Sequence, residues 1–142
     1  MFLKLENAAA VILVFENKYL FQLRDDKKNI FFPNHWGLFG GALEKREKII
    51  DGLNREIYEE LSIKLSKSKI KFFTTISFKF NQKILNRYFF VAHMNRNQKS
   101  NIKLKEGKKF KFFKSNDLKK KKLVPYDQFA FWLYLNEKKL YV

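Results

Sequence analysis

The sequence of 142 residues contains no cysteine, only two prolines and five glycines, and less than half as many acidic as basic residues. Without cysteine the chain cannot form disulfides, thiolate metal sites or a cysteine nucleophile. Its longest apolar run, residues 8 to 15, falls far short of the roughly 20 residues that span a bilayer. That run has charged flanks and no small-residue cleavage pattern, so we expect no signal peptide. These absences favour a soluble, cytoplasmic protein without a membrane partner.

The length and the hydrophobic content predict a single folded domain over residues 1–142. A chain of this size buries roughly 68–70% of its unfolded surface without covalent staples. Hydrophobic residues make up 46% of the sequence and include 17 phenylalanines, which argues against disorder. The sequence has no internal repeat and no linker rich in Pro, Gly or Ser, so we expect no second domain.

The charge is strongly positive, with 30 Lys and Arg against 14 Asp and Glu and a formal net charge of +16. Most of the basic residues are lysines, which recognise phosphate less specifically than the arginine fork does. The excess has two interpretations: a compositional bias shared with the many Phe, Ile and Asn residues, or a basic surface that attracts polyanions. The acidic residues, by contrast, gather between Glu44 and Glu60.

The hydrophobic patterns predict both strands and helices. Short runs rich in Phe, Ile and Val predict strands at residues 8–15, 19–23, 70–80, 84–94 and 110–113, with a turn at 17–18. Apolar residues at helical spacing predict a helix over 49–61, and a second helix is expected at 127–135 after Pro125. Strands interleaved with helices favour an α/β protein, with a mixed sheet covered by helices on both faces.

Three carboxylates project from one side of the helix over 49–61. At 100° per residue, Glu56 and Glu60 lie beside the apolar stripe and Glu59 lies just beyond them. Charges about 5 Å apart repel by roughly 3 kcal/mol at an effective dielectric constant near 20. A hard divalent cation, Mg²⁺ or Mn²⁺, would relieve this repulsion. The helical Gly52 suggests room for a ligand there, whereas the alternative is a solvated acidic face paired with nearby basic residues.

The spacing around these carboxylates resembles the Nudix box. That motif is Gly, five residues, Glu, seven residues, Arg-Glu, an aliphatic, any residue, Glu-Glu, any residue, Gly and an aliphatic. The sequence matches it with Gly41, Glu47 and the run from Arg55 to Ile63. Ser62 stands where the family usually has glycine, at the turn that ends the helix. The preceding segment is similar to the family's Trp-x-x-Pro-Gly-Gly, with Phe39 in place of proline. The resemblance covers Gly41–Ile63 closely and implies a Nudix-type α/β/α sandwich.

The resemblance also implies roles for individual residues. Glu56, Glu59 and Glu60, with the Gly41 carbonyl, correspond to the metal ligands of the family. Glu47 corresponds to the glutamate that pairs with Arg55 and orients the loop against the helix. A helix carboxylate or an outlying acid activates the attacking water, and Glu106 is our candidate for the outlying acid. A solvated loop position is the alternative for Glu106.

Several other side chains are candidates for substrate binding. Arg24 could hold phosphate at the end of the second expected strand. Aromatic side chains could stack on a base, although residues of this kind more often belong to the core; the candidates are Trp36, Tyr126, Phe129 and Trp132.

We therefore expect a Nudix-type pyrophosphohydrolase that uses metal-activated water on a nucleoside diphosphate-X compound, such as a nucleoside triphosphate, an oxidised nucleotide or a nucleotide sugar. The alternative is nucleic-acid binding or RNA 5′-end hydrolysis through the basic surface, where Lys119–Lys122 is the densest patch. A third hypothesis, a catalytically silent sensor, is disfavoured because every catalytic position of the box is intact. The oligomeric state stays open, with a homodimer as one option.

Overall fold

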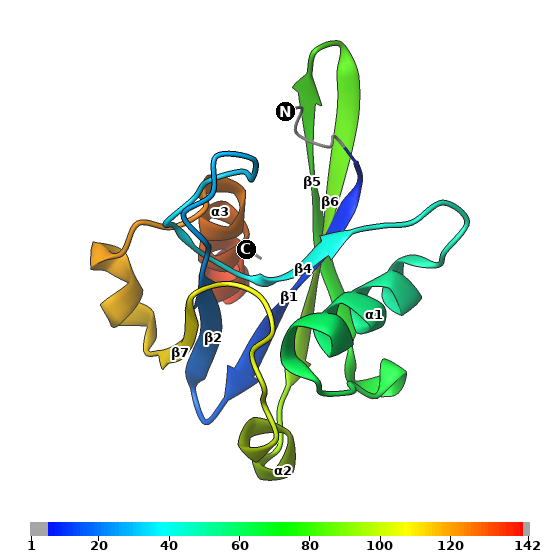
Figure 1. Cartoon of the computed structure of the whole chain (residues 1–142). Helices are drawn as coiled ribbons and strands as arrows, with labels where there is room; N and C mark the ends of the chain where they lie inside the picture. Colours follow the sequence, from blue (N-terminus) through cyan, green and yellow to red (C-terminus); the bar gives the residue numbers. More distant parts are fainter. Residues whose placement is uncertain (1–5, 141–142) are drawn as a thin grey trace.

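The computed structural model describes residues 6–140, and its centre is a seven-stranded mixed sheet (Figure 1). The strand order is β3-β2-β1-β6-β5, while β4 also pairs with β1 and β7 also pairs with β2. Among the strand pairs within residues 6–140, the central pair β1 with β6 is parallel and the others are antiparallel, and Trp36 also forms an isolated parallel bridge with Leu123. The strands are β1 Ala8–Phe15, β2 Lys18–Leu23, β3 Trp36–Gly37, β4 Phe39–Ala42, β5 Lys71–Phe80, β6 Lys83–His93 and β7 Lys109–Phe113.

Two long helices cover opposite faces of this sheet (Figure 1). Helix α1 packs on β1 through buried leucines and isoleucines, whereas α3 packs on the other face through Ala130 and Phe131. The mixed sheet between helices confirms the predicted α/β/α fold class. The helices are α1 Ile49–Leu61, α2 Arg96–Ser100 and α3 Pro125–Leu140, with short 3₁₀ helices η1 Lys67–Lys69 and η2 Ser115–Lys120.

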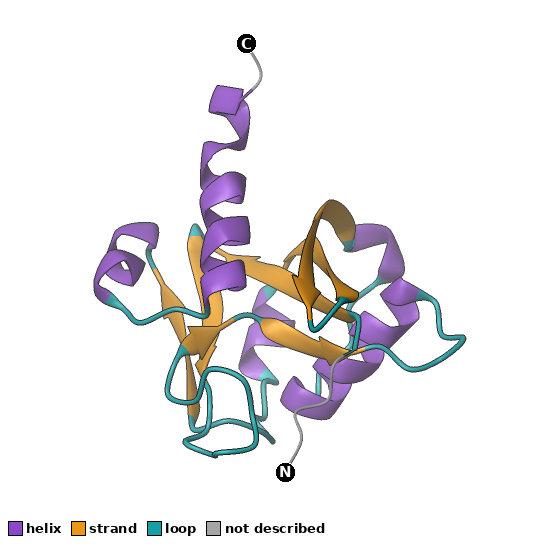
Figure 2. Cartoon of the chain, turned by 90° about the horizontal axis from the view of Figure 1, so that it is seen from above, coloured by secondary structure: helices purple, strands orange, loops and turns teal. Residues whose placement is uncertain are grey.

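Helix α3 is longer than the sequence predicted and lies only partly on the sheet. Figure 2 shows its C-terminal part projecting beyond the strands. Residues 136–139 are polar, and Leu135 and Leu140 are exposed there, which explains why the apolar pattern ended at residue 135. No helix between residues 6 and 140 combines the length and the apolar character needed to cross a bilayer.

The first hairpin turns one residue earlier than predicted. Glu16 and Asn17 both have positive φ, 47° and 61°, and β2 then begins at Lys18. A two-residue turn with both central residues at positive φ matches the right-handed twist of the adjoining strands, and asparagine tolerates that conformation well. The turn fixes the register that places Gln22 in the interior, a position that no pattern in the sequence predicted.

Helix α1 is held by a narrow apolar face, and we expect the stability of the protein to depend on it. Leu53 is completely buried, so Leu53→Ala should lower the free energy of unfolding by about 2–5 kcal/mol. Tyr58, on the exposed side of the same helix, provides the control: Tyr58→Ala should change the free energy of unfolding by less than about 1 kcal/mol. Urea denaturation measures both values, and equal losses would contradict this assignment of the buried face.

Candidate active site

Glu60 is the buried carboxylate of α1 and lies against β4. The Gly40 N–H donates a hydrogen bond to its Oε1 at 3.1 Å, and Gln22 Nε2 donates to its Oε2 at 3.1 Å. Burial raises the pKa of Glu60 to about 8, although the two hydrogen bonds counteract part of the shift. Sequence reasoning missed Gln22, because a single polar residue in an apolar strand has no local signal that identifies its partner.

Arg55 organises the loop that precedes α1. Its Nη2 and Nε donate to the two carboxylate oxygens of Glu47 at 2.8 and 3.1 Å, and Nη2 also donates to the Ala42 carbonyl. The ion pair that the resemblance implied is therefore present. The hydrogen bond from Arg55 lowers the pKa of Glu47, and the same contact raises the pKa of Arg55. This network ties the loop after β4 to the helix.

Glu56 and Glu59 differ in their surroundings. Glu56 accepts a hydrogen bond from Arg55 Nη1 at 2.8 Å, and its pKa is raised chiefly by burial, against the effect of Arg55. Glu59 is exposed and lies 3.5 Å from the same arginine nitrogen. The charge of Glu106 contributes to the raised pKa values of both Glu56 and Glu60, so this loop residue is close enough to act on both carboxylates.

The interpretation of Gly52 as space for a ligand is wrong. A Cβ atom at Gly52 would lie 2.6 Å from Glu47 Oε1 and 2.6 Å from Leu43 Cδ2. The loop before the helix therefore fills this space. Gly41 is the glycine that borders the carboxylates, because a Cβ atom there would overlap the carboxylate group of Glu56.

The donors around α1 suit a hard cation, although no three His, Asp or Glu side chains in residues 6–140 form a ready metal cluster. Glu60 is a buried carboxylate that forms no salt bridge within residues 6–140, although the charge of Arg87 acts on it from a distance. Glu56 and Glu106 add negative charge beside it. Oxygen donors of this kind match the preference of Mg²⁺ and Mn²⁺.

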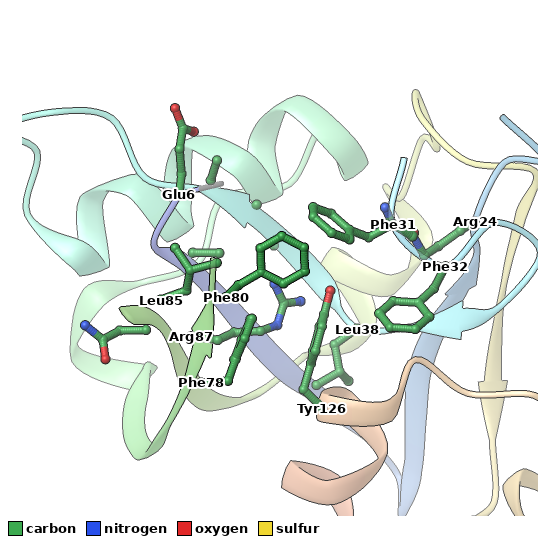
Figure 3. A pocket seen from close by; sticks show the side chains of 15 residues that line it. Glu6, Arg24, Phe31, Phe32, Leu38, Phe78, Phe80, Leu85, Arg87 and Tyr126 are labelled. Atoms are coloured by element: carbon green, nitrogen blue, oxygen red, sulfur yellow. The ribbon is translucent and has the colours of Figure 1, made fainter. Parts of the chain in front are cut away.

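A cavity of about 450 Å³ lies between β4, the strands β5 and β6, and the start of α3 (Figure 3). Gly40 and Gly41 of β4 contribute to its wall, and α3 contributes Tyr126. Two arginines, Arg24 and Arg87, line it as well. Five aromatic side chains surround the space: Phe31, Phe32, Phe78, Phe80 and Tyr126. Such a pocket, mostly apolar with a few polar groups, is typical of small-molecule sites.

The structure brings two of the five predicted substrate-binding residues to this cavity, Arg24 and Tyr126. Arg24 also supports the loop around the cavity, since its Nε donates to the Phe31 carbonyl at 2.8 Å. Trp36 is buried instead and packs edge-to-face on Phe113, 4.8 Å between ring centroids. Phe129 and Trp132 stack on each other on the exposed side of α3. A binding role for these three residues stays a prediction.

Sequence reasoning missed most of the cavity wall. Phe78 and Phe80 alternate along β5, so a strand pattern could have placed them on one face. Arg87 was detectable as a charged residue within the largely apolar strand β6, between Asn86 and a run of aromatic residues. Its partner Asp127 is 40 positions away, and no local pattern connects the two.

The fold and the acidic helix define a known family. The NUDIX domain profile matches residues 4–133, so the chain belongs to this family, which confirms the resemblance of the box. Nucleoside triphosphatase NudI from Escherichia fergusonii is 44% identical over 55 residues, which is 39% of this chain and 38% of that protein. The chain thus spans well under half the length of this curated relative in the match.

Solved structures show the same fold at lower identity. A MutT protein from Methanosarcina mazei Go1 superposes with a TM-score of 0.77 at 18% identity, covering 98% of this chain and 99% of that one. A C. elegans Ap4A hydrolase superposes with a TM-score of 0.67 at 17% identity, covering 95% and 97%. These similarities establish the fold.

The two glycines of β4 should respond differently to alanine. Gly40 has a φ of 148°, and a Cβ atom there would overlap the backbone of Ala9 and Ala10, so Gly40→Ala should lower the melting temperature by several degrees. The atoms nearest to a Cβ at Gly41 all belong to the Glu56 side chain, so Gly41→Ala should spare most of the stability and reduce turnover at least tenfold. Thermal unfolding with a hydrolysis assay separates the two effects, and similar losses in both would contradict this geometry.

Proposed function

We propose that this chain hydrolyses a diphosphate linkage in a nucleoside diphosphate-X compound, through attack of water at phosphorus. The observation that carries the proposal is the position of β4 between two complementary features. Glu60 binds the Gly40 N–H on the side of α1, while Gly40 and Gly41 line the aromatic cavity. A nucleoside in the cavity would thus place its phosphates beside the carboxylates.

The family relationship supports this proposal. Membership of the NUDIX domain family agrees with a Nudix-type pyrophosphohydrolase, and two similar proteins are named as a nucleoside triphosphatase and an Ap4A hydrolase. For X we favour a further phosphate, as in a nucleoside triphosphate, with oxidised nucleotides and nucleotide sugars as the other members of the class. The net charge of +16 would draw such anions towards the protein.

Glu56, Glu59, Glu60 and the Gly41 carbonyl would hold Mg²⁺ or Mn²⁺, which when bound neutralises phosphate charge and lowers the pKa of water. The side chains of the protein then orient the reactants. Gln22 and Gly40 fix the Glu60 carboxylate, so its oxygens need little reorganisation.

A carboxylate of the set Glu56, Glu59, Glu60 and Glu106 accepts the proton of the attacking water. The water oxygen forms the new bond to phosphorus as the bond to the bridging oxygen breaks. The leaving phosphate carries away the electron pair of that bond, and the carboxylate returns its proton to solvent.

The test is a substrate panel assayed with purified protein and Mg²⁺, with products separated by chromatography. The panel contains nucleoside triphosphates, oxidised nucleotides, nucleotide sugars and a 5′-triphosphorylated RNA. Cleavage of a mononucleotide supports the proposal. Cleavage of RNA alone would favour the alternative, in which exposed lysines such as those at 119–122 bind the nucleic-acid backbone.

We expect turnover to stop in excess chelator and to fall at least about 100-fold in Glu56→Gln, the range typical of acid–base loss. Glu59→Gln and Glu60→Gln should also abolish most activity. Asp51→Asn is a matched control, because Asp51 lies on the same helix but pairs with Lys67. Initial rates measure all four variants. Turnover that persists in chelator would overturn the metal assignment.

Hydrolysis in oxygen-18 water should place one heavy oxygen on a phosphoryl product. The chain has no cysteine, and the carboxylates in the site are suited to act as ligands or bases, so we expect no covalent intermediate. Mass spectrometry after a single turnover locates the label. Label found first in a glutamate side chain would show an acyl-phosphate intermediate instead.

A further inference from the structure

Arg87 is a mostly buried charge in the wall of the aromatic cavity, and the hydrolytic chemistry makes no use of it. It lies on β6, opposite Ile76 of β5 and Ala8 of β1. Its side chain is only 13% exposed. Figure 3 shows the guanidinium among the aromatic rings of the cavity. A buried arginine of this kind needs a physical explanation, because a charge is costly to bury even when it is paired.

One edge of this guanidinium is fixed by the protein. Asp127 Oδ1 accepts a hydrogen bond from Arg87 Nε at 3.1 Å, while Asp127 Oδ2 accepts the Leu38 N–H at 3.0 Å. The guanidinium carbon also lies 4.6 Å from the centroid of the Tyr126 ring. Because Asp127 is itself buried and held by Leu38, the orientation of the arginine is set before any ligand enters.

The two terminal nitrogens of Arg87 remain available. Within residues 6–140 the structure gives Nη1 and Nη2 no hydrogen-bond acceptor, although the residue lines the cavity. A guanidinium has donors only, in a planar fork that binds two neighbouring acceptors at once. The cavity thus presents a pair of donors that have no acceptor among the described residues, beside aromatic rings.

The surroundings favour a base over a phosphate as the ligand of this fork. The rings of Phe78 and Tyr126 stack on each other, 5.9 Å between centroids and 7° apart, and Phe31, Phe32 and Phe80 also border the cavity. Aromatic faces of this kind suit a flat ring better than a tetrahedral group. The carboxylates that suit a cation, and with it the phosphates, lie on α1 beyond Gly40 and Gly41.

We propose that Arg87 determines base specificity by donating from Nη1 and Nη2 to two adjacent acceptors, so that the protein prefers 6-oxopurine nucleotides over adenine nucleotides. This proposal rests on the proposed function and extends it to the base. Guanine presents N7 and O6 side by side, the arrangement that an arginine fork binds most often. Adenine presents N7 beside an amino donor, which would leave buried donors facing each other.

The first test changes the substrate and leaves the protein intact. We expect kcat/KM for GTP and ITP to be similar and to exceed that for ATP by about 10-fold or more, since one bidentate contact discriminates by roughly 5- to 150-fold. The analogue 7-deaza-GTP lacks the N7 acceptor, so its kcat/KM should fall towards that of ATP. Equal rates for GTP and ATP, unchanged rates for 7-deaza-GTP, or a preference for CTP would overturn the proposal.

The second test changes the residue. Arg87→Lys keeps a positive charge for Asp127 but loses the fork, so the GTP-to-ATP ratio of kcat/KM should collapse towards one. Arg24→Lys is the matched control, because Arg24 lines the same cavity. This change should lower kcat/KM for both GTP and ATP and leave their ratio unchanged. If the GTP-to-ATP ratio persists in Arg87→Lys, or falls only in Arg24→Lys, base specificity does not depend on Arg87 and the proposal is overturned. The ratio reports specificity even where the variant is less stable.

Failure of the proposed function is distinguishable from failure of this inference. If no nucleotide is hydrolysed, the proposed function is wrong. Calorimetry then still tests the role of Arg87, by measuring the binding of GMP and AMP to the unmodified protein. Tighter binding of GMP that disappears in Arg87→Lys would support the assignment, whereas equal affinities would overturn it.

Discussion

The hydrogen bond from the Gly40 N–H to Glu60 joins the helix of the site to the sheet, and the arrangement of both halves of the site depends on it. It requires β4 to run so close to β1 that any side chain at Gly40 would overlap the Ala9 carbonyl. Glycine alone permits this approach together with a φ of 148°. Because β4 pairs with the central strand, the carboxylate and the cavity wall share one rigid support.

The charges of the site oppose those of the rest of the molecule. Glu56 and Glu60 are desolvated beside each other, which raises the pKa of both, while the protein as a whole carries +16. Arg55 offsets part of the negative charge but is occupied by Glu47. Glu60 is contacted by two N–H donors and feels the charge of Arg87 only from a distance. A basic exterior that attracts anions and an acidic site that suits a cation are compatible with the proposed hydrolysis.

The sequence predicted the helix and its carboxylates better than the cavity. The spacing of Leu53, Ile57 and Leu61 is a local property, and the box motif carries its own register, so α1 and the Glu47–Arg55 pair could be predicted. Even Ser62, where glycine is usual, adopts the left-handed φ of 60° that ends the helix. The cavity depends instead on how distant segments pack: β6 lies parallel to β1, and α3 packs on one face of the same sheet. No periodicity within a segment contains that information.

The Arg87–Asp127 pair shows what long-range packing adds to the local pattern. Well-packed apolar residues of similar volume often stabilise a protein as well as a buried ion pair does. Stability alone therefore does not account for placing this pair beneath a cavity. An apolar pair could not present donors to a ligand, whereas Asp127 takes up one edge of the guanidinium and leaves the other edge open. The same carboxylate holds the Leu38 N–H, next to the glycines of β4. Recognition of a ligand ring and support of the strand beside Glu60 thus share one buried aspartate.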